Sequence, residues 1–146
     1  MSAVAGGVAA AALLVIGAFH VVWVRSSWPF ATRREFVRNL GGRRDGELPT
    51  TFALQSLGVA VLLGAAAFLV GAKADLIPGG IPTTLITVGA WGVAAVLTVR
   101  GIAGLVQSGF ELSDSPERYR FFDLRVYSPV CLVLSALIVV AIVSAG

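Results

Sequence analysis

Eight residues have side chains that could bind a polar ligand or move a proton, and they recur near the ends of apolar segments. They are His20, Trp23, Gln55, Arg100, Asp123, Arg125, Tyr127 and Cys131. Imidazole exchanges protons near neutral pH, and a guanidinium can hold an anion or an oxyanion. Trp23 follows His20 by three residues, which places both on one helix face. These residues form the candidate ligand-binding cluster, and the sequence identifies no catalytic residue among them.

The small number of other reactive residues excludes several kinds of metal and catalytic site. The chain has one histidine and one cysteine, so it has no intramolecular disulfide and no cysteine-pair metal site. No apolar segment carries a pair of carboxylates, and no nucleophile motif is present. We therefore expect no metal and no cofactor.

The composition is that of a membrane protein. Of 146 residues, 57% are hydrophobic and 13% are charged, whereas soluble domains carry about 25% charged residues. The mean hydropathy is +0.89. Six of the eleven basic residues lie between Arg25 and Arg44 and four between Arg100 and Arg125. Both stretches flank apolar segments, as the basic cytoplasmic loops of a membrane protein do under the positive-inside rule. The basic residues therefore do not indicate nucleic-acid binding.

Four apolar segments approach the roughly 20 helical residues needed to cross a bilayer. They cover about 3–24, 51–72, 81–106 and 128–145. Prolines mark the boundaries: Pro82 opens the third segment, Pro129 predicts a break before the fourth, and Pro78-Gly79-Gly80 predicts a turn. We predict an all-α membrane protein with a single domain over residues 1–146, in which four transmembrane helices form a bundle. The first segment lacks a basic region before it, and its apolar run is longer than that of a typical signal peptide, so we expect it to be retained.

The charges of the loops predict the orientation. Loops 25–50 and 107–127 hold most of the arginines, so we expect them in the cytoplasm and both termini outside. Abundant Arg, Ala, Gly and Val are typical of GC-rich bacterial genomes, which favours a bacterial inner (plasma) membrane.

Each cytoplasmic loop is expected to contain a short interfacial helix. Thr32 and Glu35 have the spacing of a capping box, and Phe36, Val37 and Leu40 share one helical face. With Arg33, Arg34 and Arg38 on the other side, this segment predicts a basic helix lying on the anionic inner leaflet; an ordinary solvated loop is the alternative. Ser115-Pro116-Glu117 predicts an N-cap, a first-turn proline and an acidic first turn.

At 1.5 Å per helical residue, the candidate residues fall at one depth near the cytoplasmic ends of the four spans. We predict that Arg100 pairs with Asp123 or with a carbonyl near Pro129, because intramembrane charges usually have a partner. His20 is expected to hydrogen-bond in the same cluster. The cluster would then form a cytoplasm-facing pocket for a lipid or a small amphipathic ligand. Simpler interpretations stay open: Arg100 snorkels to the headgroups, His20 is packed with one bond, Cys131 is a small buried hydrophobe, or the cluster only holds helices together.

Residues 121–132, Phe-Phe-Asp-Leu-Arg-Val-Tyr-Ser-Pro-Val-Cys-Leu, are the most distinctive stretch. Together with His20-x-x-Trp23 and Arg100, this stretch resembles a bacterial membrane family known as domain of unknown function 3995 (DUF3995). The resemblance covers nearly the whole chain and implies four spans, with an Asp-x-Arg-x-Tyr-Ser-Pro-x-Cys segment before the last. It implies no activity. The basic segment Arg33–Leu40 departs from the family pattern.

Three functions fit these observations. The first is a non-enzymatic ligand-binding or accessory protein. The second is a membrane-embedded enzyme acting on a lipid or quinone-like substrate, with His20 transferring a proton and Arg100 holding an anion. The third is a small transporter component, although the predicted mid-membrane region is apolar and uninterrupted. The glycines of the spans, such as Gly6, Gly64 and Gly89, permit close helix contacts within one chain or between chains, so the oligomeric state stays open.

Overall fold

The structure is a computed structural model, and it describes residues 1–78 and 80–145. The described residues contain helices and no β-strand. The helices are α1 (Ser2–Trp23), α2 (Arg33–Asn39), α3 (Phe52–Lys73), α4 (Thr83–Gly109), α5 (Glu117–Phe122), the π-helical turn η1 (Asp123–Tyr127) and α6 (Ser128–Ser144). The first three predicted spans agree with α1, α3 and α4 to within three residues at each end. Gly79 of the predicted turn lies outside the described residues.

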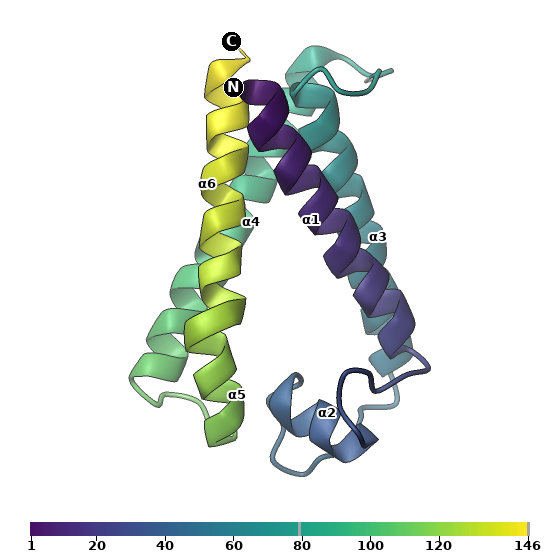
Figure 1. Cartoon of the computed structure of the whole chain (residues 1–146), viewed down its shortest axis with the longest axis vertical. Coiled ribbons are helices and arrows are strands. Elements are labelled where there is room, and N and C mark those ends of the chain that lie inside the picture. Colours follow the sequence, from purple (N-terminus) through teal and green to yellow (C-terminus); the bar gives the residue numbers. More distant parts are fainter. Residues whose placement is uncertain (79, 146) are drawn as a thin grey trace.

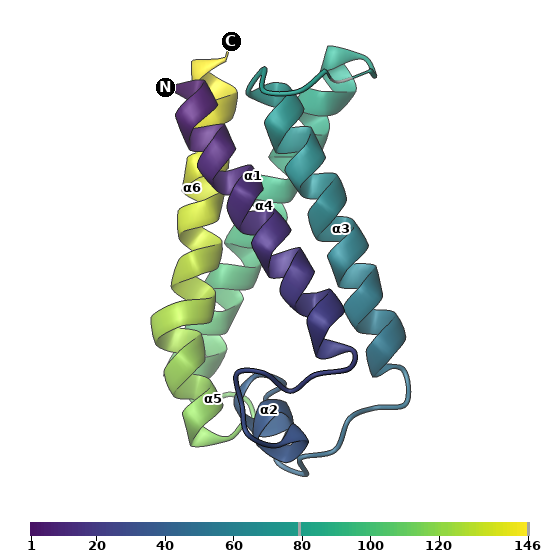
Figure 2. The same cartoon turned by 45° about the vertical axis from the view of Figure 1, so that its right-hand side comes forward.

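The long helices pack as two pairs, α1 with α3 and α4 with α6. Figure 1 shows both termini at one end of the molecule, where the pairs meet, and shows the pairs diverging toward α2 at the other end. The turned view in Figure 2 shows α2 beyond the ends of α1 and α3 and beside α5. The buried core accordingly combines residues of all four long helices, including Leu13, Val70, Ala94 and Ile138.

Glycine permits the closest helix approach in this core. A Cβ added to Gly6 of α1 would meet Cβ of Ala74 and, at 3.5 Å, Cβ of Ala141. The missing side chain therefore lets α1 contact the end of α3 and α6 together. In contrast, a Cβ at Gly64 or Gly92 would meet nothing within 4 Å.

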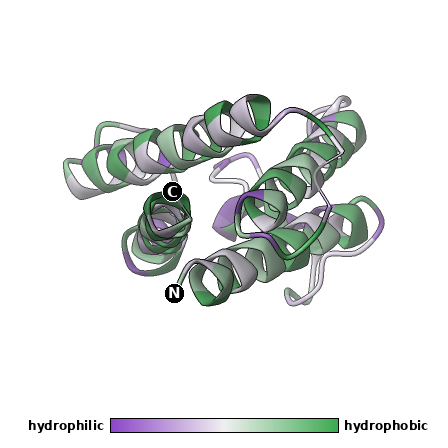
Figure 3. Ribbon diagram, turned by 90° about the horizontal axis from the view of Figure 1, so that it is seen from above, coloured by the Kyte–Doolittle hydropathy of each residue, from purple (hydrophilic) through white to green (hydrophobic). Residues whose placement is uncertain are grey.

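The outward surfaces of the long helices are apolar. Four helical segments are long and apolar enough to cross a membrane, and only 22–33% of the residues in their apolar windows are buried inside the chain. Figure 3 looks along the helices and shows hydrophobic residues on their outer as well as their inner sides. Val61 and Leu62, for example, are 72% and 69% exposed. Such continuous apolar exposure fits a hydrocarbon surrounding and not water.

The last helix corrects the predicted break at Pro129. α5, η1 and α6 form one apolar helical segment from Glu117 to Ser144. Proline has no N–H, and its ring clashes with the carbonyl four residues earlier in an α-helix. Here the turn before Pro129 is widened, and the Ser128 N–H donates to the Asp123 carbonyl, five residues back. The helix therefore passes through the proline. At its start, Pro116 and not Ser115 occupies the N-cap, without a side-chain cap bond.

The short helix α2 begins as predicted, with the Glu35 N–H donating to Thr32 Oγ1 at 3.2 Å. Its apolar face, however, turns toward the rest of the chain, because Phe36 and Val37 are each 1% exposed. Arg33 also turns inward, unlike the exposed Arg38. The apolar face of α2 therefore packs against the chain, and its placement on the inner leaflet stays a prediction. Helix α2 lies across the wide end of the molecule (Figure 1).

Candidate functional site

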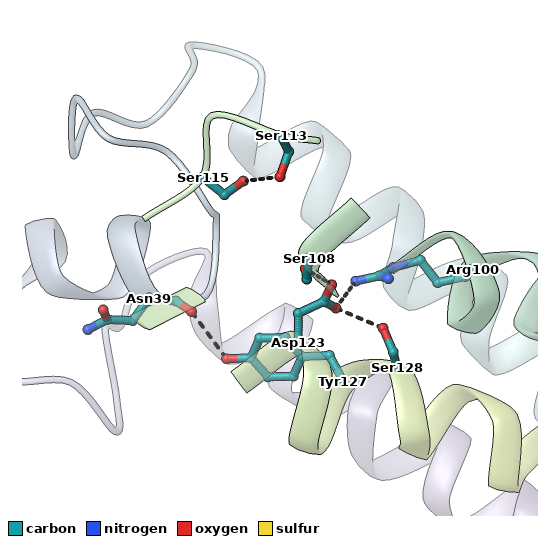
Figure 4. Close-up of polar contacts among 8 residues, drawn as sticks. All are labelled: Asn39, Arg100, Ser108, Ser113, Ser115, Asp123, Tyr127 and Ser128. Atoms are coloured by element: carbon teal, nitrogen blue, oxygen red, sulfur yellow. Dashed lines mark hydrogen bonds and ion pairs between the residues drawn. The ribbon is translucent and has the colours of Figure 1, made fainter. Parts of the chain in front are cut away.

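A buried carboxylate on η1 is the centre of the first polar group, which we call the carboxylate cluster (Arg100, Ser108, Asp123 and Ser128). Asp123 is 2% exposed. Its Oδ1 accepts from Arg100 Nη2 at 2.9 Å and from Ser128 Oγ at 3.0 Å, and its Oδ2 accepts from Ser108 Oγ at 2.6 Å. Figure 4 shows these donors converging on Asp123 from α4 and from the start of α6. The predicted Arg100–Asp123 pair is confirmed.

Only the aspartate of the Arg100–Asp123 ion pair is buried. The Arg100 side chain is 43% exposed, whereas that of Asp123 is 3% exposed. A Cβ at Gly104, one turn after Arg100, would meet Ser128 Oγ and Arg100 Nη1, and would lie 3.0 Å from Asp123 Oδ2. Gly104 therefore leaves the space in which the pair and its serine donors meet. Both oxygens of Asp123 on η1 accept hydrogen bonds from side chains of α4 and α6. The cluster therefore fixes the packing of α4 on η1 and α6.

The η1 turn also reaches α2. The Tyr127 hydroxyl donates to the Asn39 carbonyl at 3.3 Å, as drawn in Figure 4. The Tyr119 ring packs beside Gly42, where an added Cβ would lie 3.2 Å from it. These two tyrosines connect the α5–η1 segment, which carries Asp123, to α2 and the loop that follows it.

His20, Trp23 and Gln55 lie apart from the carboxylate cluster. His20 Nδ1 bonds to the Ile16 carbonyl of its own helix at 2.8 Å, and Gln55 Nε2 donates to Thr51 Oγ1 at 3.0 Å. The expectation that His20 bonds within the Arg100 cluster was therefore wrong. A side chain four residues from a carbonyl on its own helix finds that partner at no cost in long-range ordering.

These three residues instead share a cleft of about 410 Å³ between α1, α2 and α3, which we call the α1–α3 cleft. Its walls are largely apolar and aromatic. They include Trp23, Phe36, Leu40, Phe52 and Val59, with Arg43 also in the lining. The ring centroids of His20 and Trp23 are 5.1 Å apart, and those of Trp23 and Phe36 are 5.6 Å apart. Ser56 also lines the cleft, and its hydroxyl donates to the His20 carbonyl at 2.7 Å, joining α1 to α3.

Arg33 fixes the geometry of this cleft. Its guanidinium donates to the carbonyls of Trp23, Ser26 and Val24 at 2.8, 2.9 and 3.1 Å. The carbonyls at a helix C-terminus have no partner inside the helix, so Arg33 satisfies the end of α1. The same guanidinium lies 5.7 Å from the Phe36 ring centroid, and it thereby holds α2 against α1.

The other candidate residues have local contacts. The Arg125 guanidinium lies 4.1 Å from the Phe121 ring centroid, a cation–π arrangement. Cys131 is half-buried on α6 and has a free thiol. Neither residue bonds to Asp123 among the described hydrogen bonds.

The sequence reasoning missed Ser108, Arg33 and Asn39 as contributors. Ser108 had a usable signal, because Arg100, Gly104 and Ser108 recur every four residues and so share one face of α4. Arg33 had no such signal, since its partners are backbone carbonyls at the end of α1 and in the loop that follows it.

A second cleft, of about 520 Å³, lies at the opposite end between α3 and α4, lined by residues that include Lys73, Asp75 and Thr83. None of the eight predicted residues lines it.

Comparison with known proteins gives one match. The profile of a family described as protein of unknown function (DUF3995) matches residues 13–138. No curated protein matches the chain, and no solved structure matches it.

Proposed function

Since the chain belongs to the DUF3995 family, whose description assigns no activity, we propose a function from its own geometry: it is a non-enzymatic membrane protein that binds a small amphipathic molecule in the α1–α3 cleft. The observation that carries the proposal is the cleft itself, of about 410 Å³, which contains His20, Trp23 and Gln55. Small-molecule sites are typically concave, mostly apolar and provided with a few polar groups.

The separation of the polar groups supports binding over catalysis. The enzyme hypothesis needs His20 and Arg100 around one substrate. His20 belongs to α1, bonds to a carbonyl of that helix and lines a cleft with α2 and α3. Arg100, in contrast, forms an ion pair with Asp123 on η1. The carboxylate cluster then has the role of fixing α4 against η1 and α6.

We place the protein in a bacterial inner membrane, with the termini outside and with loops 25–50 and 107–127 in the cytoplasm. The arginine-rich loops support this orientation. Both termini lie at the end opposite α2 (Figure 1), so the α1–α3 cleft would open near the cytoplasmic surface.

The binding proposal is tested by filling the cleft. Val59 lines it and is 38% exposed, whereas Val61 on the same helix is 72% exposed and does not line it. The wild type, Val59→Trp and the matched control Val61→Trp are purified from native membranes into nanodiscs, and their small-molecule content is measured by mass spectrometry. We expect one species to be retained by the wild type and by Val61→Trp and to be lost from Val59→Trp. Equal content in all three folded proteins would refute the proposal.

The orientation is tested by cysteine labelling. In a Cys131→Ser background, Ser2→Cys and Arg38→Cys are treated in whole cells with a membrane-impermeant maleimide. Ser2→Cys should be labelled in intact cells and Arg38→Cys only after lysis; the reverse pattern would invert the proposed orientation.

A further inference from the structure

The hydrogen-bonding groups of the α1–α3 cleft indicate which class of amphipathic molecule it takes, an inference that rests on the function proposed above. His20 is the central group. The Ile16 carbonyl can only accept, so the 2.8 Å contact requires that Nδ1 carry the proton. In a neutral imidazole, Nε2 is then an acceptor with a free lone pair.

The Nε2 atom of His20 is accessible. No hydrogen-bond partner of Nε2 is found among the described residues, and no buried side-chain nitrogen or oxygen among them lacks a partner. An unpartnered Nε2 must therefore lie open, and the cleft is the space that His20 lines.

Gln55 adds a second acceptor. Its Nε2 donates to Thr51 Oγ1 at 3.0 Å, which leaves its Oε1 without a partner among the described side chains and leaves its second amide N–H free as a donor. Ser56, the other polar side chain nearby, already donates its hydroxyl proton to the His20 carbonyl at 2.7 Å.

Arg43 is the charged side chain in the lining of the cleft, and it forms an ion pair with Asp45. Arg43 donates to both carboxylate oxygens of Asp45, at 3.2 and 2.6 Å. The interior walls are formed by the rings of Trp23, Phe36 and Phe52. The cleft thus combines aromatic walls with hydrogen-bond acceptors.

We infer that the ligand is a neutral amphiphile whose polar end is a hydroxyl group, which donates to His20 Nε2 while its apolar part lies against the aromatic walls. A carboxylate or phosphate at this depth would face the lone pairs of His20 and Gln55. A ligand with only acceptor oxygens would leave the lone pair of His20 Nε2 without a donor.

The test uses three probes that share a nonyl chain and a benzene ring: 4-nonylphenol, 4-nonylanisole and 4-nonylbenzoate. Each is partitioned between protein-loaded and empty nanodiscs of the same phosphatidylcholine. One neutral hydrogen bond corresponds to about a fivefold difference in affinity, so the phenol should bind the wild type about fivefold more tightly than the anisole. His20→Phe keeps a ring beside Trp23 and should reduce this preference to roughly twofold or less. His20→Gln, which provides an acceptor again, should restore part of the preference.

The outcomes separate the two proposals. If phenol and anisole bind equally and Val59→Trp abolishes both, the cleft is a binding site but the hydroxyl assignment is wrong. If the benzoate binds most tightly, the ligand is an anion and the assignment is equally wrong. If none of the probes binds the wild type more than Val59→Trp, the proposed function itself fails along with the inference.

Discussion

Replacing the two partners of the Arg100–Asp123 pair, singly and together, should show that the pair is coupled and that its two members are unequal. Arg100→Met leaves a carboxylate that is 2% exposed without its counter-charge. Removing one partner of a buried pair costs roughly 3–5 kcal/mol. The hydroxyls of Ser108 and Ser128 still donate to Asp123, so we expect a value near the lower end, about 3 kcal/mol.

Asp123→Asn should cost less. It leaves a guanidinium whose side chain is 43% exposed and which can turn toward water or headgroups. The expected loss is about 1–2 kcal/mol, from weakened hydrogen bonds to the serines. The double variant Arg100→Met/Asp123→Asn buries no lone charge and should cost about 2 kcal/mol, less than Arg100→Met alone. The coupling free energy is then roughly 2–3 kcal/mol.

The assay is reversible unfolding of the purified protein in mixed micelles, with increasing SDS and with helix content followed by circular dichroism. Arg125→Met is the matched control, because its guanidinium stacks on Phe121 and pairs with no carboxylate of the described residues; it should change the free energy of unfolding by about 0.5–1 kcal/mol. Additive single effects, with coupling below about 0.5 kcal/mol, would show that the ion pair contributes no mutual stabilisation. A larger loss for Asp123→Asn than for Arg100→Met would refute the reasoning from exposure.

Three further predictions concern the packing at Gly104, the hydrogen bonds of Arg33 and the Arg43–Asp45 ion pair. Gly104→Ala should destabilise the protein by about 1–3 kcal/mol in SDS unfolding, because its Cβ would enter the carboxylate cluster, whereas Gly92→Ala, with nothing within 4 Å, should be neutral or stabilising. Arg33→Lys should lower the stability by about 1–2 kcal/mol, since an ammonium cannot reproduce a fork that donates to three carbonyls; an unchanged unfolding midpoint would contradict this role. Hydrogen bonds from Arg43 hold the pKa of Asp45 below its ordinary value, so the stabilising effect of this pair is present above the ordinary aspartate pKa and is lost as the pH falls through the lowered one. A carboxyl ¹³C titration should show the pKa of Asp45 rising in Arg43→Met, and no change would exclude the contact in solution.

The presence and approximate limits of the four long apolar helices followed from the sequence because length and apolarity alone decide which segments can cross a bilayer. The Arg100–Asp123 pair followed from the cost of an isolated charge in lipid. The direction of α2 did not follow, since an amphipathic helix has the same pattern whether its apolar face meets lipid or protein. Phe36 shows the difference only through its 1% exposure.

Two local details were also predicted wrongly. Proline predicts a helix break on local grounds, but Ser128 and Asp123 together support a widened turn that carries the helix past Pro129. His20 was assigned to the Arg100 cluster from depth alone. Equal depth does not place two side chains on the same side of a molecule whose helix pairs diverge (Figure 1).

The ion pair between α4 and η1 also bears on how the chain is inserted during synthesis. Asp123 is synthesised 23 residues after Arg100, so α4 reaches the bilayer before its arginine has a partner. The apolar window of α4 has a mean hydropathy of 1.7, the lowest of the four spans, and that of the last span has the highest, 2.6. We therefore expect α4 to wait beside the insertion machinery until the α5–α6 segment emerges, and the two to enter the bilayer as a hairpin with the charge already neutralised.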